Sequence, residues 1–516
     1  MTKLTYANMY SDGLKDEEIR ARFLSELQAA RQRETRDCPH RIGTESLAVG
    51  AVSERRDPTD RNRVVARLYS ADAAVIEQAV AESRRALPAW RARDYQERAA
   101  IIEALIPILE TRREEIAALV ALELGKAQGD AITEVTECID VIELSLKDYR
   151  EADGFTTPLQ APAGAQWSGV VFRPYGVFAA IAPFNFPVAI PFTMLVSALL
   201  TGNTVVFKPS GLTPACGELV YSLFKDAGVP DGVLNLVQGD GETGALLAKS
   251  DIDGVVFTGS AEVGLDLVNE LSRPPYVRPV IAEMGGKNPA VVTDSTADVA
   301  AAARVVARSA FGMTGQKCTA CSRAIVFDGV YDEFIEALRA EVAKFGYGDP
   351  ADAASIGGPL VNENSVDRYE RVIATAQADG RVVAGGNVDR ATGNFVEATV
   401  IDGLPQGHSL TRDELFLPVL TVTKVSDIDE ALAEANAVPF GLSAGIFADD
   451  DVQRDRFLDA IEAGIVFVNH AGGATTGVWP GNQTMSGWKA SGTTGKGGFG
   501  PYYLQQFVRE QSRTIF

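Results

Sequence analysis

Asn203-Thr-Val-Val-Phe-Lys-Pro-Ser210 is a short run of β-branched and aromatic residues that ends in a lysine and a proline. A helical pattern follows it over 213–227. The neighbouring runs VFAAIAP (177–183), VLNLVQG (233–239) and DGVVFTGS (253–260) precede a proline-rich helix start, a helix over 242–248 and a helix over 262–272. Four strand–helix units in about a hundred residues are typical of a doubly wound parallel sheet. The sequence therefore predicts an α/β fold.

The same alternation resumes after Glu283, which indicates a second α/β domain. Its expected strands are 289–294, 322–329, 395–402, 417–425 and 444–450, with helices over 297–313 and 331–345. Before the first sheet, apolar residues at helical spacing predict helices over 73–95, 96–125 and 129–150. Residues 151–176 are rich in proline, glycine and alternating apolar residues, which favours a projecting hairpin. The proline-free tail 503–515 could add a strand to the sheet of another subunit.

Composition excludes several classes of protein. The chain has 516 residues, 46% hydrophobic and 23% charged, which is ordinary for a soluble enzyme of two or three domains. A net charge of −21 disfavours nucleic-acid binding, because such binding needs clustered lysine and arginine. Residues 178–200 carry no charge, but three prolines at four-residue spacing make a membrane span a poor interpretation. The N-terminus lacks the apolar run of a secretory signal, so a cytoplasmic location is expected.

The cysteines point to covalent chemistry rather than to disulfides or metal binding. They number five and are mostly far apart, which is not a disulfide framework. Cys318 and Cys321 alone are too few ligands for zinc, because no histidine pair lies near them in sequence, and no metal is expected. Cys318 lies among glycine and polar residues beside Lys317, the setting of a nucleophile; the alternative is a buried small hydrophobe.

Two further residues suit the chemistry of such a thiol. Glu283 begins Glu-Met-Gly-Gly-Lys-Asn288, 35 residues before Cys318, where a carboxylate at a strand end could activate water. Asn185 lies in the proline-stiffened turn Ala182-Pro-Phe-Asn-Phe-Pro187, where a fixed amide donor would suit an oxyanion hole. The structural alternatives are a carboxylate bonded to backbone and a turn-capping asparagine.

Two glycine loops are candidates for binding a dinucleotide. Residues 239–244 match GxGxxG, with Gly239 as the first glycine. The match comes late in the sheet, however, and no clear acidic residue ends a strand about 20 residues further on. The second loop, with Gly259, Ser260 and Gly264, also ends a strand and opens a helix, whose N–H groups could hold a pyrophosphate. Lys208 is a candidate for the adenosine ribose. Each loop alone could be a tight turn, but two in successive units favour cofactor binding.

Six ordered motifs resemble the aldehyde dehydrogenase superfamily from about Arg63 to the C-terminus: PFNFP, VVFKPS, FTGS-x-x-x-G, EMGGKN, GQKC and Glu414-Leu-Phe416-Leu-Pro. The resemblance implies that Cys318 attacks an aldehyde, that Asn185 and the Cys318 N–H hold the oxyanion, and that Glu283 activates water. It implies NAD or NADP as cofactor, with Lys208 and Glu414 at the two riboses, Ser260 at the pyrophosphate and Phe416 near the nicotinamide ribose.

A finer resemblance is to the bacterial 1-pyrroline-5-carboxylate (L-glutamate γ-semialdehyde) dehydrogenases, carried by AEMGGKNPAVV, SAFGMTGQKCTACSRAIV and SGTTGKGGFGPYYL. It implies oxidation of that semialdehyde to glutamate, with Thr319, Gly487, Trp488 and Phe186 as the substrate-binding candidates. It also implies a cofactor domain of residues 1–153 and 173–282, a catalytic domain of 283–488 and an oligomerisation arm of 154–172 and 489–516. The assembly expected is a homodimer or homotetramer, and the partner is a small aldehyde.

Three departures from these relatives leave alternatives open. Residues 469–487 are about three residues longer than usual and carry Trp479, so an aromatic or other hydrophobic aldehyde is a second candidate substrate. Gly211 stands where many NAD-specific relatives have an acid, which leaves NADP open, and Leu417 replaces a usual glycine. Two other classes are disfavoured. Glu283 disfavours a coenzyme A-acylating enzyme, and the complete set of Cys318, Glu283 and Asn185 disfavours a non-catalytic binding protein.

Overall fold

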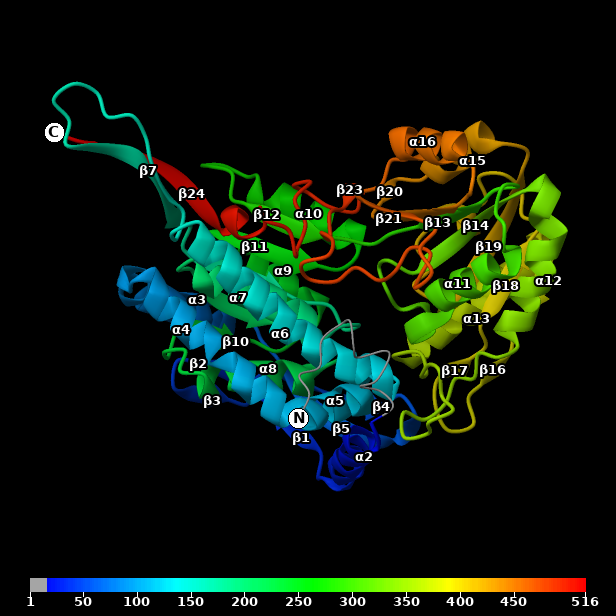
Figure 1. The fold of residues 1–516 in the computed structure, drawn as a ribbon. Helices are drawn as coiled ribbons and strands as arrows, with labels where there is room; N and C mark the ends of the chain where they lie inside the picture. Colours follow the sequence, from blue (N-terminus) through cyan, green and yellow to red (C-terminus); the bar gives the residue numbers. More distant parts are fainter. Residues whose placement is uncertain (1–15) are drawn as a thin grey trace.

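The four strand–helix units form most of a seven-stranded sheet in the computed structural model, which describes residues 16–516 (Figure 1). The strand order is β12-β11-β8-β9-β10-β2-β3. Strands β8 to β12 run parallel, whereas β2 pairs antiparallel with β10 and forms a hairpin with β3. The bounds are β8 (Val177–Ile181), β9 (Thr204–Lys208), β10 (Leu234–Leu236), β11 (Gly254–Thr258), β12 (Val280–Glu283), β2 (His40–Ile42) and β3 (Glu45–Leu47).

Helices cover both faces of this sheet because successive strand side chains point to opposite sides. In β8, Phe178 and Ala180 enter the core shared with α5 (Leu105–Leu124), α6 (Gln128–Glu151), α7 (Ala189–Leu200) and α8 (Pro214–Asp226). Val177 and Ala179 enter the opposite core, with α3 (Ala73–Ala92), α9 (Gly241–Lys249) and α10 (Ala261–Leu271). The predicted doubly wound α/β fold is confirmed.

The second lobe is also a seven-stranded sheet between helices. Its order is β15-β18-β19-β14-β13-β21-β22, parallel except for β15. Its strands are β13 (Asn288–Val292), β14 (Cys321–Phe327), β15 (Arg381–Ala384), β18 (Thr399–Asp402), β19 (Val419–Val425), β21 (Ser443–Phe447) and β22 (Ile465–Val468). Its helices are α11 (Val299–Phe311), α12 (Tyr331–Val342), α13 (Glu363–Asp379), α14 (Ser409–Arg412), α15 (Ile428–Asn436) and α16 (Asp451–Ala460).

The chain passes from one lobe to the other through the Glu-Met-Gly-Gly-Lys-Asn stretch. Strand β12 ends the first sheet at Glu283, and β13 begins inside the second sheet at Asn288. A Cβ on Gly285 would come within 2.0 Å of Glu414 Oε2, so a larger residue at this crossing would displace the Glu414 carboxylate. The crossing therefore brings the ends of both sheets, and the residues that follow them, to one place.

A β arm projects from the first lobe (Figure 1). It consists of β6 (Thr156–Pro158), β7 (Trp167–Pro174) and β24 (Val508–Ile515), with β7 in the middle. The predicted arm included all of 489–516, but residues before β24 return to the lobes, where the Met284 N–H donates to the Ser491 carbonyl (2.9 Å) and the Ser491 hydroxyl donates to the Gly285 carbonyl (2.7 Å).

The helix expected over 96–125 is interrupted. It forms α4 (Tyr95–Glu103) and α5, because Pro107 has no N–H to donate to the carbonyl of Glu103. The sequence patterns predicted no element over 17–70, where the structure has α2 (Glu17–Gln32), β1 (Arg36–Cys38), β4 (Ala51–Asp57) and β5 (Asp60–Ser70) besides β2 and β3. Two short pairs complete the fold, β16 (Val388–Asp389) with β17 (Phe395–Val396) and β20 (Phe440–Gly441) with β23 (Trp488–Lys489).

Residues 178–200 form β8, a turn and α7, and no helix within 16–516 is long and apolar enough to span a membrane.

Candidate active site

The loop that carries Cys318 has a tightly constrained backbone. After α11, Met313, Thr314 and Gly315 all have positive φ (52°, 57° and 67°). The Thr314 hydroxyl donates to the Gly358 carbonyl (2.7 Å), and a Cβ on Gly315 would come within 2.2 Å of the Leu417 carbonyl oxygen. Backbone strain of this kind persists where surrounding contacts fix it, as at functional sites. The Leu417 side chain is buried in the core beside α13, so this unexpected residue has a packing role.

Cys318 lies where two cavities meet. One, of about 1460 Å³, runs along the first sheet, and the other, of about 930 Å³, opens between the lobes; Cys318 lines both. The Cys318 carbonyl accepts from Asn288 Nδ2 (2.8 Å), which fixes the backbone beneath the thiol. Burial, with the Glu414 and Glu283 carboxylates, raises the pKa of the thiol to about 12, whereas the Thr319 and Cys318 backbone N–H groups act to lower it.

Asn185 and Glu283 reach the same junction from the first sheet. Asn185 is 4% exposed and lines the larger cavity, and its Nδ2 donates to the Gln316 carbonyl (3.0 Å), which commits one of its two amide hydrogens. Glu283 lines the smaller cavity, and its Oε1 accepts from the Gly498 N–H (2.7 Å). Burial raises the pKa of Glu283 to about 7, which suits a base that works near neutral pH.

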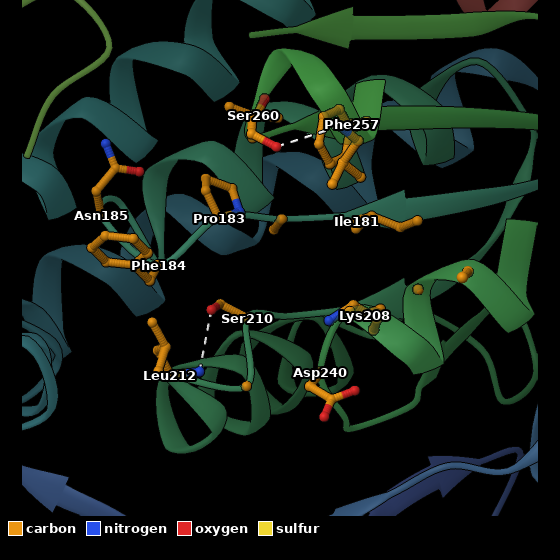
Figure 2. A pocket seen from close by; sticks show the side chains of 18 of the residues that line it. Ile181, Pro183, Phe184, Asn185, Lys208, Ser210, Leu212, Asp240, Phe257 and Ser260 are labelled. Atoms are coloured by element: carbon orange, nitrogen blue, oxygen red, sulfur yellow. Dashed lines mark hydrogen bonds between the residues drawn. The ribbon is translucent and has the colours of Figure 1, made fainter. Parts of the chain in front are cut away.

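The larger cavity contains most of the candidate cofactor residues. Figure 2 shows Lys208, Ser210 and Asp240 on one side of it and Phe257 and Ser260 on the other. The Ser260 hydroxyl accepts from the Val263 N–H (3.4 Å) as the N-cap of α10, and Gly259 precedes it. Helix N-termini of this kind bind phosphate groups.

Lys208 and the first glycine loop fit together by close packing. Lys208 Nζ donates to the carbonyls of Pro209 (2.8 Å) and Gly239 (3.0 Å), and burial lowers its pKa to about 8. A Cβ on Gly244 would lie 3.4 Å from Lys208 Cε, and one on Gly239 would come within 2.1 Å of Thr243 Oγ1. In the second loop, a Cβ on Gly264 would lie 2.2 Å from Met284 Sδ. Gly239 and Gly264 therefore allow close packing and do not line the cavity.

Glu414 and Phe416 complete the larger cavity at its end near Cys318. Glu414 Oε1 accepts from the Gly286 N–H (3.0 Å), and burial raises the pKa of this carboxyl to about 7. Phe416 has φ 54° and packs edge-on against Phe184, with ring centroids 5.7 Å apart.

Of the four substrate-binding candidates, two line the smaller cavity. Thr319 and Phe186 do so, and Phe186 has Lys126 Nζ 3.9 Å from its ring centroid. Gly487 and Trp488 line neither cavity, because β23 pairs with β20 and leaves Trp488 48% exposed. Trp479 lines the smaller cavity instead; it is 5% exposed, and its Nε1 donates to Asp140 Oδ2 (2.6 Å).

Sequence reasoning missed Arg304 and Arg308 of the smaller cavity and named Lys317 only as the cation beside the thiol. Arg304 and Arg308 lie four residues apart on α11, so they share one face of that helix, and Lys317 directly precedes the cysteine. None of the three makes a side-chain ion pair or hydrogen bond within residues 16–516. Glu137, whose pKa burial raises to about 8, and Tyr503 line the same cavity. The spacing of the two arginines before the cysteine loop was the available sequence signal.

No group of three or more histidine, cysteine, aspartate or glutamate side chains that could hold a metal ion occurs in the described chain.

The Cys318 thiol thus lies where two cavities meet, with the Asn185 amide in the wall of the larger cavity and the Glu283 carboxylate in the wall of the smaller one. Residues 48–512 match the aldehyde dehydrogenase family, and the chain belongs to that family. It is an NAD(P)-dependent oxidoreductase.

Two curated relatives differ in the substrate that they are named for. The chain is 38% identical over 433 residues to the α-ketoglutarate semialdehyde dehydrogenase of Haloferax volcanii, covering 81% of this chain and 87% of that one. It is 32% identical over 508 residues to the 1-pyrroline-5-carboxylate dehydrogenase of Geobacillus kaustophilus, covering 96% of each.

Two solved structures have a similar fold. The 1-pyrroline-5-carboxylate dehydrogenase of Thermus with bound NAD matches with a TM-score of 0.93 and 30% identity, covering 100% of this chain and 99% of that one. The proline utilization A protein of Bdellovibrio bacteriovorus matches with a TM-score of 0.92 and 30% identity; the match covers 97% of this chain and 52% of that longer one.

Proposed function

We propose that the protein oxidises an aldehyde that carries a carboxylate, with L-glutamate γ-semialdehyde, which would yield glutamate, as the first candidate. The observation that carries this proposal is the cavity leading to Cys318, which contains three cationic side chains without ion-pair partners in the described chain, Arg304, Arg308 and Lys317. Guanidinium groups bind carboxylates in bidentate geometry. The names of the relatives support the proposal, since both denote acids or semialdehydes of acids.

The chain's own residues supply the steps of the oxidation. The sulfur of Cys318 bonds to the aldehyde carbon as the thiol proton leaves to a base, and the carbonyl oxygen becomes an oxyanion. Asn185 Nδ2 and the Cys318 N–H are the candidate donors to that oxyanion. NAD(P)⁺, when bound, would supply the acceptor for the hydride of the same carbon, which would leave a thioester on Cys318. Glu283 then removes a proton from water, whose oxygen bonds to the thioester carbon as the carbon–sulfur bond breaks.

The larger cavity fits the cofactor in chemistry as well as in size. The N-terminus of α10 with Ser260 would hold the pyrophosphate, and Lys208 and Glu414 would bind the two riboses. Phe416 would pack at the nicotinamide end, since it lies with Glu414 and Cys318 in the same cavity. This assignment would make the first lobe the cofactor domain and the second the catalytic domain.

The experiment that tests the substrate is a set of initial rates with L-glutamate γ-semialdehyde, α-ketoglutarate semialdehyde, benzaldehyde and a short aliphatic aldehyde, each with NAD and NADP. A clear preference for an acidic semialdehyde supports the proposal. Preference for benzaldehyde would favour the second candidate, an aromatic aldehyde, for which Trp479 and Phe186 in the cavity wall are the supporting observation.

Two controls separate the other classes of protein. Product analysis with and without coenzyme A distinguishes hydrolysis from acyl transfer, and Glu283 favours hydrolysis. Cys318→Ala should abolish turnover and leave cofactor binding intact. A non-catalytic binding protein would show no turnover to lose. Assembly as a homodimer or homotetramer and a cytoplasmic location are part of the same proposal.

A further inference from the structure

The carboxylate of Asp240 lies at the adenosine end of the larger cavity. Asp240 precedes α9 and lines that cavity together with Lys208, Ser210 and Gly211 (Figure 2). Its charge acts on the Lys208 ammonium, whose pKa it raises against the effect of burial. Asp240 therefore lies within electrostatic reach of the lysine assigned to the ribose.

One oxygen of this carboxylate remains uncommitted. Asp240 Oδ1 accepts from the Glu242 N–H (3.0 Å) as the N-cap of α9. Within residues 16–516 the side chain makes no ion pair, and it is exposed to the cavity. Oδ2 is thus available to accept a hydrogen bond from a ligand.

The backbone of Gly211 faces Asp240 across a narrow gap. A Cβ on Gly211 would lie 3.1 Å from the Gly239 carbonyl oxygen and 3.6 Å from Asp240 Cα. Gly211 stands where many NAD-specific relatives have an acidic residue, so this position left both NAD and NADP open as cofactors. The structure places an acid on the other side of the same gap, on a different loop.

The nearby cations are not placed to offset this charge. Lys208 donates to two backbone carbonyls, and Arg273 pairs with Glu270 (2.9 Å). Lys249 lies at the far end of α9, about 12 Å along the helix from its first residue. Lys249 and Arg368 line the same cavity without an ion pair in residues 16–516, but Lys249 belongs to the opposite end of α9 and Arg368 acts on Glu414. A phosphate on the ribose would therefore meet the Asp240 carboxylate first.

We propose that Asp240 is a specificity-determining residue that accepts a hydrogen bond from the adenosine ribose and repels a 2′-phosphate, so that the enzyme prefers NAD over NADP. A carboxylate in this role discriminates by attraction to one cofactor and repulsion of the other. The inference rests on the cofactor placement of the proposed function and goes beyond it in naming the cofactor and the discriminating residue.

The test compares ADP with 2′,5′-ADP by calorimetric titration of the full-length enzyme, which requires no turnover. Asp240→Asn removes the charge and keeps an N-cap side chain, so α9 should be retained; Asp240→Ser is a second variant with the same property. We expect the wild type to prefer ADP, and both variants to bind 2′,5′-ADP roughly tenfold more tightly, as expected for removal of one repulsive charge. NADP and NAD kinetics should shift in the same direction.

Glu242→Gln is the matched control, because it makes the same charge change two residues away on a side chain that does not line the cavity. An unchanged ratio of the two affinities in both Asp240 variants, an equal shift in Glu242→Gln, or a wild type that prefers 2′,5′-ADP would each overturn the assignment. Absence of ADP binding to the wild type would overturn the cofactor site together with it.

Discussion

The resting Cys318 thiol is a weak acid in its own site. Burial is the largest cause, and the Glu414 and Glu283 carboxylates add to it. Glu283 itself is raised to about 7 by burial, so near neutral pH it changes between a protonated, neutral form and an ionised form that can act as a base. Protonation of Glu283 removes the base but also removes one charge that opposes formation of the thiolate. The pH dependence of turnover near neutral pH should therefore reflect the ionisation of Glu283 rather than that of the Cys318 thiol.

Glu283→Gln should preserve a single burst of reduced cofactor and slow steady-state turnover by roughly 10²- to 10⁴-fold, the usual contribution of a general base. The wild-type kcat should rise as pH increases through about 7, because only the ionised carboxylate accepts a proton from water, and the variant should lack this rise. Stopped-flow absorbance at several pH values measures both quantities. Loss of the burst itself would contradict the assignment of Glu283 to water activation.

Arg304→Gln and Arg308→Gln should each raise KM for the acidic semialdehyde about tenfold, since each removes one cation that faces the carboxylate. KM for a short neutral aldehyde should not change. Arg339→Gln on α12, whose side chain is exposed and lies 3.8 Å from Glu336, is the control for loss of a surface charge. Equal effects on both aldehydes would show that the two arginines act on the fold rather than on the substrate.

At the scale of elements, most of the residues predicted for the cofactor line the larger cavity, whereas only Thr319 and Phe186 of the four substrate candidates line the smaller one. Lys208 and Ser260 directly follow continuous apolar runs, and parallel strands bring such ends to one edge of a sheet. The smaller cavity is assembled from α6, α7, α11 and the loops near Trp479 and Gly498, which are far apart in sequence. No local pattern distinguishes Trp479, which enters that wall, from Trp488, which β23 turns outward.

Trp479→Phe should loosen the loop of residues 469–487. Trp479 Nε1 donates to Asp140 Oδ2 on α6 and so ties this loop to the first lobe. Loss of one such hydrogen bond costs about 1 kcal/mol, with more if the carboxylate is left unsatisfied. We expect a lower Tm in a thermal melt and a higher KM for the aldehyde. Trp488→Phe is the matched control, because Trp488 is half exposed and lines neither cavity; an equal response of both variants would refute this role.

At the scale of the whole molecule, the candidate active site depends on the relative position of the two lobes, because residues of both line its cavities. Residues 284–287 connect the sheets, and the segment after β23 crosses back over them, where the Ser491 hydroxyl and the Gly498 N–H bond to Gly285 and Glu283. The sequence analysis assigned all of residues 489–516 to an oligomerisation arm. The glycines of that segment instead pack against the site, because a residue with a side chain could not approach Met485 and Glu283 so closely. A Cβ on Gly497 would lie 1.9 Å from the Met485 carbonyl oxygen.

The arm predicts how the protein assembles. Strand β24 pairs with β7 along its whole length, from Val508 to Ile515, and the outer edge of β24 pairs with no strand in the described chain. An open edge of this length, ending in the exposed Ile515 and Phe516, is suited to pairing with another chain.

A chain of 55.0 kDa should therefore appear as a dimer or tetramer in light scattering after size-exclusion chromatography. Deletion of 509–516 should reduce the mass to that of a smaller assembly, while Arg513→Ala, which keeps the backbone ladder, should leave it unchanged. A wild-type protein that is monomeric at micromolar concentration would contradict the prediction, and a deletion variant with the full assembled mass would assign assembly to another surface.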